Sequence, residues 1–389
     1  MNTENTQVIN YKIKDFYSKK FSSAPELAIQ SPGRINIMGE HTDYNNGFVL
    51  PAAIDRSMFI ALAKNGTDRC NCYSVDYEED GIIELHNVKR SEVGWLNLIS
   101  GVVDQLKDRI GGFDLAFGGN IPEGSGLSSS AALCCGVAMG LSRLFNLKLE
   151  KWDMAKIAQH SEHHFALVKC GIMDQFACLF GLTNHALLLN CKTLDYEPSA
   201  FDLMGYKFVL FNSNVPHDLK NSAYNDRRRE SQHALDMINS RTNSTKTYQD
   251  ITPKDFMSLK GEVKPNIWKR AMHVVTENDR VFKIREALSK RKFEEAGRLL
   301  IDSHNSAKYD YEITCEQTDF LVEQFTSYED VYGARQVGGG FGGCILAITH
   351  DKDVNGMLSD LDQKYQKKYN LSISHIPIHI SRGCHLLED

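Results

Sequence analysis

The order in which strand-like and helix-like patterns follow one another most constrains how this 389-residue chain can fold. Short apolar runs separated by Gly, Pro and Asn fill much of the first 63 residues and are typical of strands. Long helical patterns occupy most of residues 222–326, and two compact β segments follow at 343–349 and 372–380. Because strands and helices do not alternate strictly, the pattern favours an α+β fold over a doubly wound parallel sheet. The other expected elements are helices over residues 8–21, 95–106, 131–145 and 153–167, the last with Asp153 as N-cap, and strands over residues 27–30, 34–38, 47–50, 57–63, 111–117, 187–190 and 206–212.

Length and composition indicate a globular chain with more than one domain. At roughly 100–200 residues per domain, a chain of this length is expected to form two or three domains. A polar stretch near residues 195–205 suggests a boundary, which predicts an N-terminal domain over 1–200 and a C-terminal domain over 201–389. With 42% hydrophobic and 24% charged residues, the chain does not match disordered, collagen-like or coiled-coil classes.

Charge and cysteine usage bear on partners and location. The net charge is −6, so the chain has no general basic excess and a nucleic-acid partner is not expected. The ten cysteines form no C-x-x-C pair, which favours buried free thiols in a reducing compartment. The first residues are polar and no apolar run reaches the ~20 residues of a membrane span. We therefore expect a soluble, cytoplasmic protein that has no membrane partner and exists as a monomer.

A glycine- and serine-rich loop before the helix at 131–145 is the strongest local signal for phosphate binding. Two glycines let the backbone approach an anion closely, and serines at a helix N-terminus add hydroxyl and N–H donors. The loop lacks the Lys of a P-loop and the third Gly of a dinucleotide fingerprint. A serine-capped helix after a glycine turn is the open structural alternative. The candidate nucleotide-binding residues here are Gly124, Ser125, Gly126, Leu127, Ser128, Ser129, Ser130 and Ala131.

A second glycine cluster, at residues 338–343, has five glycines in six positions and directly precedes the β segment at 343–349. So many glycines are costly in backbone entropy when the chain folds. This cost predicts a backbone that must come close to a ligand or to another loop. A plain flexible hinge is the alternative, which the central Phe341 and the following β segment disfavour.

Polar side chains are dense over residues 31–45. In a strand, Arg34 and Asn36 share one face, while Glu40, His41 and Asp43 cluster on the turn that follows. A ligand rich in hydroxyl groups, such as a sugar, would be bound by such carboxylates and imidazole. Surface ion pairing is the alternative, and one His with two carboxylates is too generic to predict a metal site.

Two further carboxylates and a pair made of one Trp and one Asn are candidate site residues. Asp174 stands in an otherwise apolar run, where a charge is costly unless it is paired, so it is either a structural or a catalytic Asp. Arg34 could be its partner by charge alone. Glu162, together with the serines, could hold Mg²⁺ through oxygen ligands. Trp95 and Asn97 could bind a nucleotide base, with a core Trp as the alternative. For the neighbouring histidines, His160, His163 and His164, we favour solvated or core roles over a metal site.

Taken in order, these segments resemble the galactokinase family, a branch of the GHMP small-molecule kinases. The stretch 33–45 resembles that family's own signature, the loop at 122–133 the shared phosphate-binding motif, and residues 338–343 the third motif. Further similarity covers residues 170–176, 222–229, 273–281 and 303–315. The resemblance implies a two-lobed α+β fold with mixed sheets and an active site between the lobes. It also implies transfer of the ATP γ-phosphoryl group to the C1 hydroxyl of galactose.

The resemblance assigns a role to each matching residue. Asp174 would be the general base and Arg34 would stabilise the developing charge. Ser130 and Glu162 would bind Mg²⁺, and Trp95 would lie in the adenine pocket. The residues that would hold the sugar hydroxyls are Glu40, His41, Asp43, Gly171 and Tyr224.

The sequence departs from the family pattern in three places. Gln336-Val337 replaces a usual Met-Thr, Leu167 replaces a usual Gly, and Gln317-Thr318 interrupts a usual Pro-Glu-Leu-Asp. None of these removes the catalytic pair, but they leave room for another sugar, such as N-acetylgalactosamine or arabinose. A non-catalytic sensor of sugar and nucleotide is the alternative from another functional class.

Overall fold

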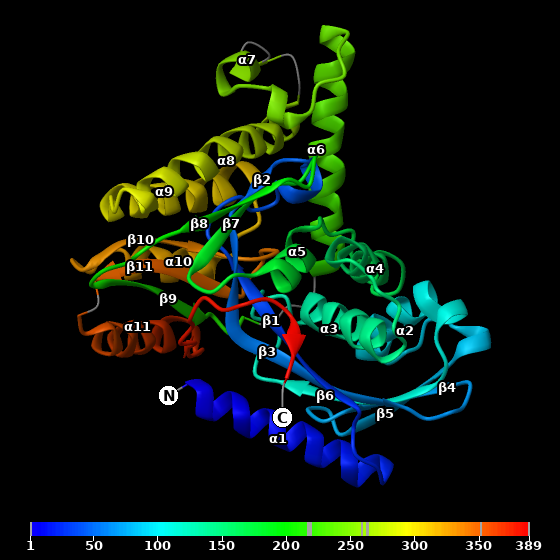
Figure 1. The fold of residues 1–389 in the computed structure, drawn as a ribbon. Coiled ribbons are helices and arrows are strands. Elements are labelled where there is room, and N and C mark those ends of the chain that lie inside the picture. The colour runs from blue at the N-terminus through cyan, green and yellow to red at the C-terminus, as the bar shows by residue number, and fades with distance from the viewer. Residues whose placement is uncertain (1, 216–219, 258–259, 262–263, 351, 388–389) are drawn as a thin grey trace.

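The computed structural model describes residues 2–215, 220–257, 260–261, 264–350 and 352–387 (Figure 1). Its largest sheet has six strands in the order β13-β1-β3-β6-β4-β5. All neighbours in this sheet are antiparallel except β4 and β6. The strands are β1 (Leu27–Asn36), β3 (Pro51–Lys64), β4 (Arg69–Ser74), β5 (Glu79–Glu84), β6 (Phe113–Gly119) and β13 (His385–Leu386).

Two smaller sheets complete the strand content of the described residues. A four-stranded sheet runs in the order β10-β11-β9-β12, and a three-stranded sheet in the order β2-β7-β8. The strands of the four-stranded sheet are β9 (Tyr206–Asn212), β10 (Val331–Gln336), β11 (Cys344–His350) and β12 (Ser374–His375). Those of the three-stranded sheet are β2 (Phe48–Val49), β7 (His185–Asn190) and β8 (Tyr196–Ala200).

Helices cover both faces of the six-stranded sheet (Figure 1). On one face α1 (Asn2–Phe21) buries Ile13 and Tyr17 against Phe59. On the other, the small residues of α3 let it lie close to the sheet: a Cβ on Gly136 would come within 2.4 Å of Ile60. The helices of this second face are α2 (Gly94–Leu106), α3 (Ser129–Leu144), α4 (Lys151–His164) and α5 (Met173–Phe180).

The second half of the chain is rich in helix. Helices α8 (Pro265–Ser289) and α9 (Phe293–Ser306) pack on each other, and α9 lies on the four-stranded sheet. The other helices of this half are α6 (Lys220–Thr242), α7 (Pro253–Met257), α10 (Glu316–Phe325) and α11 (Val354–Tyr369). Leu321 and Phe325 of α10 and Leu361 of α11 form a core with Val209 and Phe211 of β9.

One hydrophobic core joins the two halves. It includes Ile29 and Val137 from the first half and Leu300 and Leu346 from the second. The chain also crosses back at its end, since β13 pairs with β1 through Ile29 and Leu386. Strand β13 therefore places the last described residues in the six-stranded sheet of the first half. The division into domains over 1–200 and 201–389 remains a prediction.

Several expected elements need correction. Strands 27–30 and 34–38 are one strand, β1, with an irregularity between Pro32 and Arg34, where proline has no N–H to donate. In the segment 372–380 only β12 forms a strand. Asp153 is the N3 residue of a capping box whose N-cap is Glu150, because the helix begins two residues earlier. The hairpin β4–β5, strands β8, β10 and β13, and helices α5 and α11 were not expected. The strands at 206–212 and 343–349 are confirmed.

Candidate active site

A cavity of about 250 Å³ lies where β1 and its following turn, the serine loop, α5 and the second glycine cluster meet. Most of the residues singled out from the sequence line it. They are Arg34, Glu40, His41, Asp43, Gly124, Ser125, Gly126, Leu127, Ser128, Ser129, Ser130, Glu162, Asp174 and Tyr224. Trp95, Asn97, Ala131 and Gly171 are not among the lining residues.

The centre of the cavity is the ion pair of Arg34 and Asp174. Nε of Arg34 lies 2.7 Å from Oδ1 of Asp174, and Nη2 lies 2.8 Å from Oδ2. The hydroxyl of Ser128 donates to Oδ2 at 2.5 Å, and Nη1 of Arg34 donates to the carbonyl of Gly126 at 2.7 Å. Burial disfavours the charge of Arg34, but Asp174 outweighs this effect and raises the pKa of the guanidinium. The pairing expected from charge alone is present, and it orients the carboxylate rigidly.

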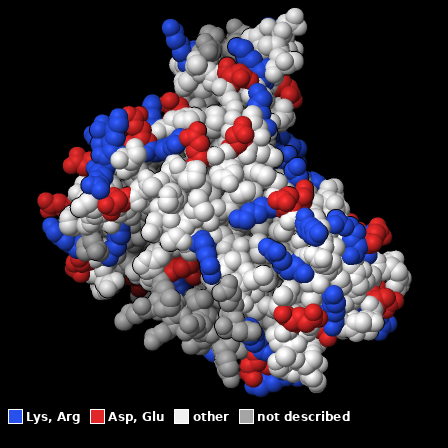
Figure 2. Space-filling model, viewed as in Figure 1, with Lys and Arg blue, Asp and Glu red and all other residues white. Residues whose placement is uncertain are grey.

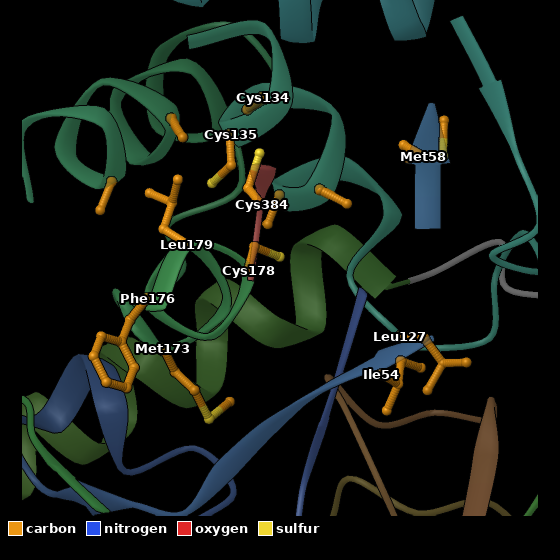
Figure 3. Packing of buried hydrophobic residues seen from close by; sticks show 14 of the residues in the cluster. Ile54, Met58, Leu127, Cys134, Cys135, Met173, Phe176, Cys178, Leu179 and Cys384 are labelled. Carbon is orange, nitrogen blue, oxygen red and sulfur yellow. The ribbon is translucent and has the colours of Figure 1, made fainter. Parts of the chain in front are cut away.

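Helix α5 presents Asp174 from its first turn because the rest of the helix is anchored in the core. Phe176, Cys178 and Leu179 are fully buried, and Cys135 of α3 lies beside Cys178 (Figure 3). The end of the chain adds a backbone bond, since the N–H of Cys384 donates to the carbonyl of Cys178 at 2.7 Å. As expected, the cysteines are free thiols, nine of them buried.

The serine loop is built to leave donors facing the cavity. Gly124 and Gly126 have φ of 64° and 76°, and Ser128 has φ of 64°. Ser128 is the N-cap of α3, yet its hydroxyl makes no cap hydrogen bond and donates to Asp174 instead. The alternative of a serine-capped helix is therefore not what this geometry shows. Ser129 and Ser130, the first residues of α3, line the cavity, and an anion is favoured at a helix N-terminus.

The second glycine cluster packs directly on the serine loop. A Cβ on Gly338 would come within 2.8 Å of the carbonyl oxygen of Gly126, and one on Gly343 within 3.1 Å of the carbonyl oxygen of Ser125. The N–H of Cys344 donates to that same carbonyl at 3.1 Å. This close approach between two loops is the reason for the glycines, as the sequence analysis expected, and a hinge does not account for it.

The turn after β1 contributes three polar side chains. Oε1 of Glu40 accepts hydrogen bonds from Nη2 of Arg335 at 3.0 Å and from the N–H of Gly338 at 3.1 Å. Asp43 is buried, and burial, followed by the charge of Asp174, raises the pKa of its carboxyl to about 7. Gly171 lies behind Asp43 so closely that a Cβ there would come within 2.1 Å of Oδ2. Gly171 thus leaves room for the Asp43 side chain in the cavity wall, although it does not itself line the cavity.

Glu162 and Ser130 are adjacent at the cavity wall. The hydroxyl of Ser130 donates to Oε1 of Glu162 at 2.8 Å, and the thiol of Cys170 donates to Oε2 at 2.9 Å. Burial, then the charge of Asp174, raises the pKa of Glu162. A hydroxyl and a carboxylate are the hard oxygen ligands that Mg²⁺ takes from proteins when phosphates supply the others, so this pair fits the ion.

Metal clusters of the zinc type are not found among the described residues, in which no group of three His, Cys, Asp or Glu side chains converges. Nε2 of His163 bonds the carbonyl of Cys170 at 2.7 Å, and Nε2 of His160 lies 3.5 Å from Oδ2 of Asp104. These local partners agree with the non-metal roles expected for the histidines.

Trp95 and Asn97 lie at the start of α2, away from the cavity wall. Nε1 of Trp95 donates to Oε2 of Glu79 at 2.7 Å, and its ring packs on Phe117 in the core. The amide of Asn97 donates to the carbonyl of Ser91 and accepts from its N–H, so both of its polar atoms are engaged. Their contact with a nucleotide base stays a prediction. Ala131 is fully buried behind the loop.

Two charged residues that sequence reasoning gave no role support the site from the second half of the chain. Arg335 is buried and bonds Glu40 and the carbonyl of Ile37. Glu277 is fully buried and accepts the N–H groups of Gly39 and Glu40 at 3.1 and 3.2 Å. Both residues lie more than 230 positions after the turn in the sequence, so no local pattern connects them with it. Of the two, only Glu277 falls within a stretch, residues 273–281, whose similarity to the family had been noted.

Three family descriptions match the chain. They are the galactokinase galactose-binding signature over residues 15–64, the GHMP kinases N terminal domain over residues 97–182, and the GHMP kinases C terminal over residues 284–367. The first holds the turn after β1, the second the serine loop and α5, and the third the strand before the glycine cluster and the cluster itself.

Curated relatives match over nearly the whole chain. A galactokinase of Thermotoga petrophila is 38% identical over 360 residues, which cover 92% of this chain and 99% of the relative. A galactokinase of Bacillus subtilis is 37% identical over 366 residues, which cover 92% and 94%.

Solved structures agree with this result. The crystal structure of Lactococcus lactis galactokinase complexed with galactose superposes with a TM-score of 0.94 at 32% identity, covering 97% of this chain and all of that one. The Methanococcus jannaschii mevalonate kinase shares the fold alone, with a TM-score of 0.60 at 17% identity. With its polar turn, serine loop and glycine cluster around one cavity, the chain belongs to the galactokinase family of GHMP kinases.

Proposed function

We propose that this protein transfers the γ-phosphoryl group of ATP to the C1 hydroxyl of D-galactose, giving galactose 1-phosphate and ADP. The observation that carries the proposal is the Arg34–Asp174 pair at 2.7 and 2.8 Å, set between the turn of the galactose-binding signature and a loop suited to phosphate. The relatives named as galactokinases and the relative crystallised with galactose support both the activity and the sugar.

Asp174 and Arg34 are proposed as the catalytic pair. Phosphoryl transfer needs little covalent help from the protein, so orientation of the attacking hydroxyl and stabilisation of charge dominate. Both oxygens of Asp174 are held by Arg34, and one also by Ser128. A carboxylate fixed in this way can accept the C1 hydroxyl proton or orient that hydroxyl. The guanidinium beside it favours the negative charge that develops during transfer.

The sugar is proposed to lie against Glu40, His41, Asp43 and Tyr224, with Gly171 leaving room for the Asp43 carboxylate. Carboxylate and imidazole acceptors facing one small cavity suit a ligand with several hydroxyl groups. N-acetylgalactosamine and arabinose remain the alternative substrates to be tested.

The nucleotide is proposed to place its phosphates on the serine loop. The free N–H groups of α3 and the residues from Gly124 to Ser130 would bind them, with Trp95 and Asn97 toward the base. Ser130 and Glu162 are the residues that would hold Mg²⁺. When bound, this ion neutralises charge on the β- and γ-phosphates.

We propose a cytoplasmic monomer without a nucleic-acid partner. Basic and acidic side chains lie intermixed on the face shown in Figure 2, which does not favour a polyanion. In the described part of the chain, no helix has the length and apolar character that a membrane crossing requires. The free cysteines agree with a reducing compartment.

A coupled assay of ADP release tests the function. Wild-type protein with Mg-ATP is offered galactose, N-acetylgalactosamine, glucose, arabinose and mevalonate. Turnover on galactose is expected to fall by orders of magnitude in Asp174→Ala and to persist in Asp360→Asn, a control on the exposed side of α11. Turnover on another sugar, with none on galactose, would change the proposed substrate but keep the kinase activity. ATP binding without turnover on any substrate would refute the kinase and favour a non-catalytic sensor.

A further inference from the structure

Two side chains from different parts of the chain hold the carboxylate of Glu162. The hydroxyl of Ser130, in the first turn of α3, donates to Oε1 at 2.8 Å. The thiol of Cys170, in the loop between α4 and α5, donates to Oε2 at 2.9 Å. Ser130 is itself one of the residues that would hold Mg²⁺. Cys170 is thus a buried contact of a candidate metal ligand that the proposed function does not use.

The backbone of Cys170 is fixed to the helix that carries Glu162. Its carbonyl oxygen accepts hydrogen bonds from Nε2 of His163 at 2.7 Å and from Nε2 of Gln159 at 3.4 Å. A carbonyl oxygen can only accept, so Nε2 of His163 carries a proton in this contact. Glu162 and His163 follow Gln159 by three and four residues on α4, which places all three on one face of the helix. Helix α4 therefore binds Cys170 at its carbonyl, while the thiol of Cys170 binds the carboxylate of α4.

The direction of the bond between Cys170 and Glu162 follows from the chemistry of the two groups. A carboxylate that binds a metal ion is ionised, and an ionised carboxylate has no proton to donate. Gln175, a buried residue of α5, also lies near the sulfur, with its Nε2 at 3.6 Å. The carboxylate is both the nearer neighbour and the charged one, which makes it the stronger acceptor for the thiol proton. In the ionised form, both Ser130 and Cys170 therefore donate to Glu162.

The thiol fixes the orientation of the carboxylate without competing for a hard cation. It occupies Oε2 and leaves Oε1 beside the hydroxyl oxygen of Ser130. Mg²⁺ takes oxygen ligands, whereas a protonated sulfur is a poor ligand for it. Cys170 and Glu162 both line the cavity and are both buried, so their hydrogen bond lies in a setting of low dielectric, where it is stronger than in water.

We propose that Cys170 is a positioning residue that holds the Glu162 carboxylate with one oxygen beside Ser130, in the orientation that binds Mg²⁺. This inference rests on the proposed function and adds to it a residue that acts through Glu162. Hydrogen-bonded partners behind metal ligands commonly change metal affinity 10-fold or more. Loss of the thiol should therefore weaken the contribution of Mg²⁺ to nucleotide binding, while the contacts between the nucleotide and the serine loop stay intact.

Calorimetric titration with ADP measures this contribution without turnover. The dissociation constant of ADP is determined with EDTA and with Mg²⁺, and the first value divided by the second is the magnesium ratio. Cys170→Ala is expected to lower the magnesium ratio about 10-fold and to leave the constant in EDTA within about 2-fold of wild type. An unchanged ratio would overturn the proposal, and so would an equal weakening under both conditions, which would show general damage to the cavity. A wild-type ratio near one would also overturn it.

Three further variants separate positioning from support of the fold. Cys170→Ser keeps a donor of similar size and should retain the magnesium ratio within about 2-fold of wild type. His163→Ala keeps the thiol but removes the bond to the Cys170 carbonyl, so it should lower the ratio about 3- to 5-fold. Cys70→Ala is the matched control, since Cys70 is a fully buried thiol of β4 outside the cavity wall, and it should change neither constant.

The variants also keep the test decisive. If Cys170→Ser loses the magnesium ratio as Cys170→Ala does, the hydrogen bond is not what the thiol provides and the proposal fails. If Cys170→Ala does not fold, His163→Ala carries the test, and an unchanged ratio there overturns the proposal. The assay of ADP release separates this inference from the proposed function. Wild-type protein without turnover on any sugar refutes the function, whereas turnover on galactose together with a wild-type ratio in Cys170→Ala refutes the inference alone.

Discussion

Replacing Glu277 is the sharpest test of how the second half of the chain holds the turn after β1, which carries Glu40, His41 and Asp43. Its carboxylate is fully buried and accepts four hydrogen bonds, from the N–H groups of Gly39 and Glu40, from the hydroxyl of Ser303 at 2.8 Å and from Nε of Arg280 at 2.7 Å. Burial alone would raise its pKa, but the charges of Arg280, His273 and Arg335 together outweigh burial and lower it from 4.5 to about 2.

The pKa gives the magnitude and the sign. The interval between 4.5 and about 2 corresponds to about 3 kcal/mol of stability carried by the charged form of Glu277. Because the pKa is depressed in the folded state, this stability is present above pH 4.5 and is lost as the pH falls toward 2. At pH 4 the wild type has already lost about 0.8 kcal/mol of it. Glu277→Gln has no charge to lose.

Urea unfolding at pH 7 and pH 4, followed by circular dichroism, measures this effect. Glu277→Gln should be less stable than wild type by about 2–3 kcal/mol at pH 7, and the gap should narrow by about 0.8 kcal/mol at pH 4. The control is Glu286→Gln on the same helix, where an exposed carboxylate pairs with Lys290 and little change is expected. A gap of the same size at both pH values would refute the role of the charge, as would a variant as stable as wild type.

Three further predictions follow from strained or buried groups. Leu167 is 48% exposed and has φ of 62°, a conformation that favours glycine. Leu167→Gly should therefore raise stability by about 0.5–1 kcal/mol in thermal unfolding, whereas Leu167→Ala should bring no gain. A loss of stability in Leu167→Gly would contradict this reasoning. The hydroxyl of Thr318 donates to Oε1 of Gln336 at 2.7 Å in a buried site, so Thr318→Val should lower the free energy of unfolding in urea by about 1–3 kcal/mol. The double variant Thr318→Val with Gln336→Leu should recover part of this loss, because no buried polar group is then left without its partner. Strictly additive losses would argue against the pairing. The raised pKa of Asp43, about 7, means that its carboxyl contributes stability below pH 4 that is lost as the pH rises through 7. Wild type should therefore lose more stability than Asp43→Asn between pH 5 and 8.5, and parallel pH profiles would exclude the shift.

The departures from the family pattern show how much sequence reasoning can miss. Gln336 and Thr318 were noted as two separate departures, yet in the fold they are hydrogen-bonded to each other, and Nε2 of Gln336 also donates to the carbonyl of Ile313 at 3.2 Å. Two unusual residues that make one buried pair compensate each other. Their separation of 18 residues, across a helix and a strand, gives no local pattern that would predict the contact.

Several of the elements missed by the sequence analysis are short and lack a clear apolar period, whereas helix α11 was missed although it has 16 residues. Strands β4 and β5 have only six residues each, with the apolar Ile82 of β5 exposed, and β10 lies in a mixed polar stretch. Helix α5 has eight residues, too few for its periodicity to stand out from an apolar strand. Their conformation is decided by packing against neighbours rather than by their own composition.

The local chemistry of the site could be inferred from short stretches of the sequence. Glycines that need positive φ, serines at the start of a helix, and a polar turn after a strand are properties of short segments, so residues 31–45, 122–133 and 338–343 could be read directly. The partners of the buried charged residues, in contrast, depend on the folded chain. Arg34 meets Asp174 across 140 residues, and Arg335 meets Glu40 across 295. A charged residue in an apolar stretch needs a partner when it is buried, and this need can be inferred from the sequence. Which residue is the partner depends on the segments that the folded core brings together.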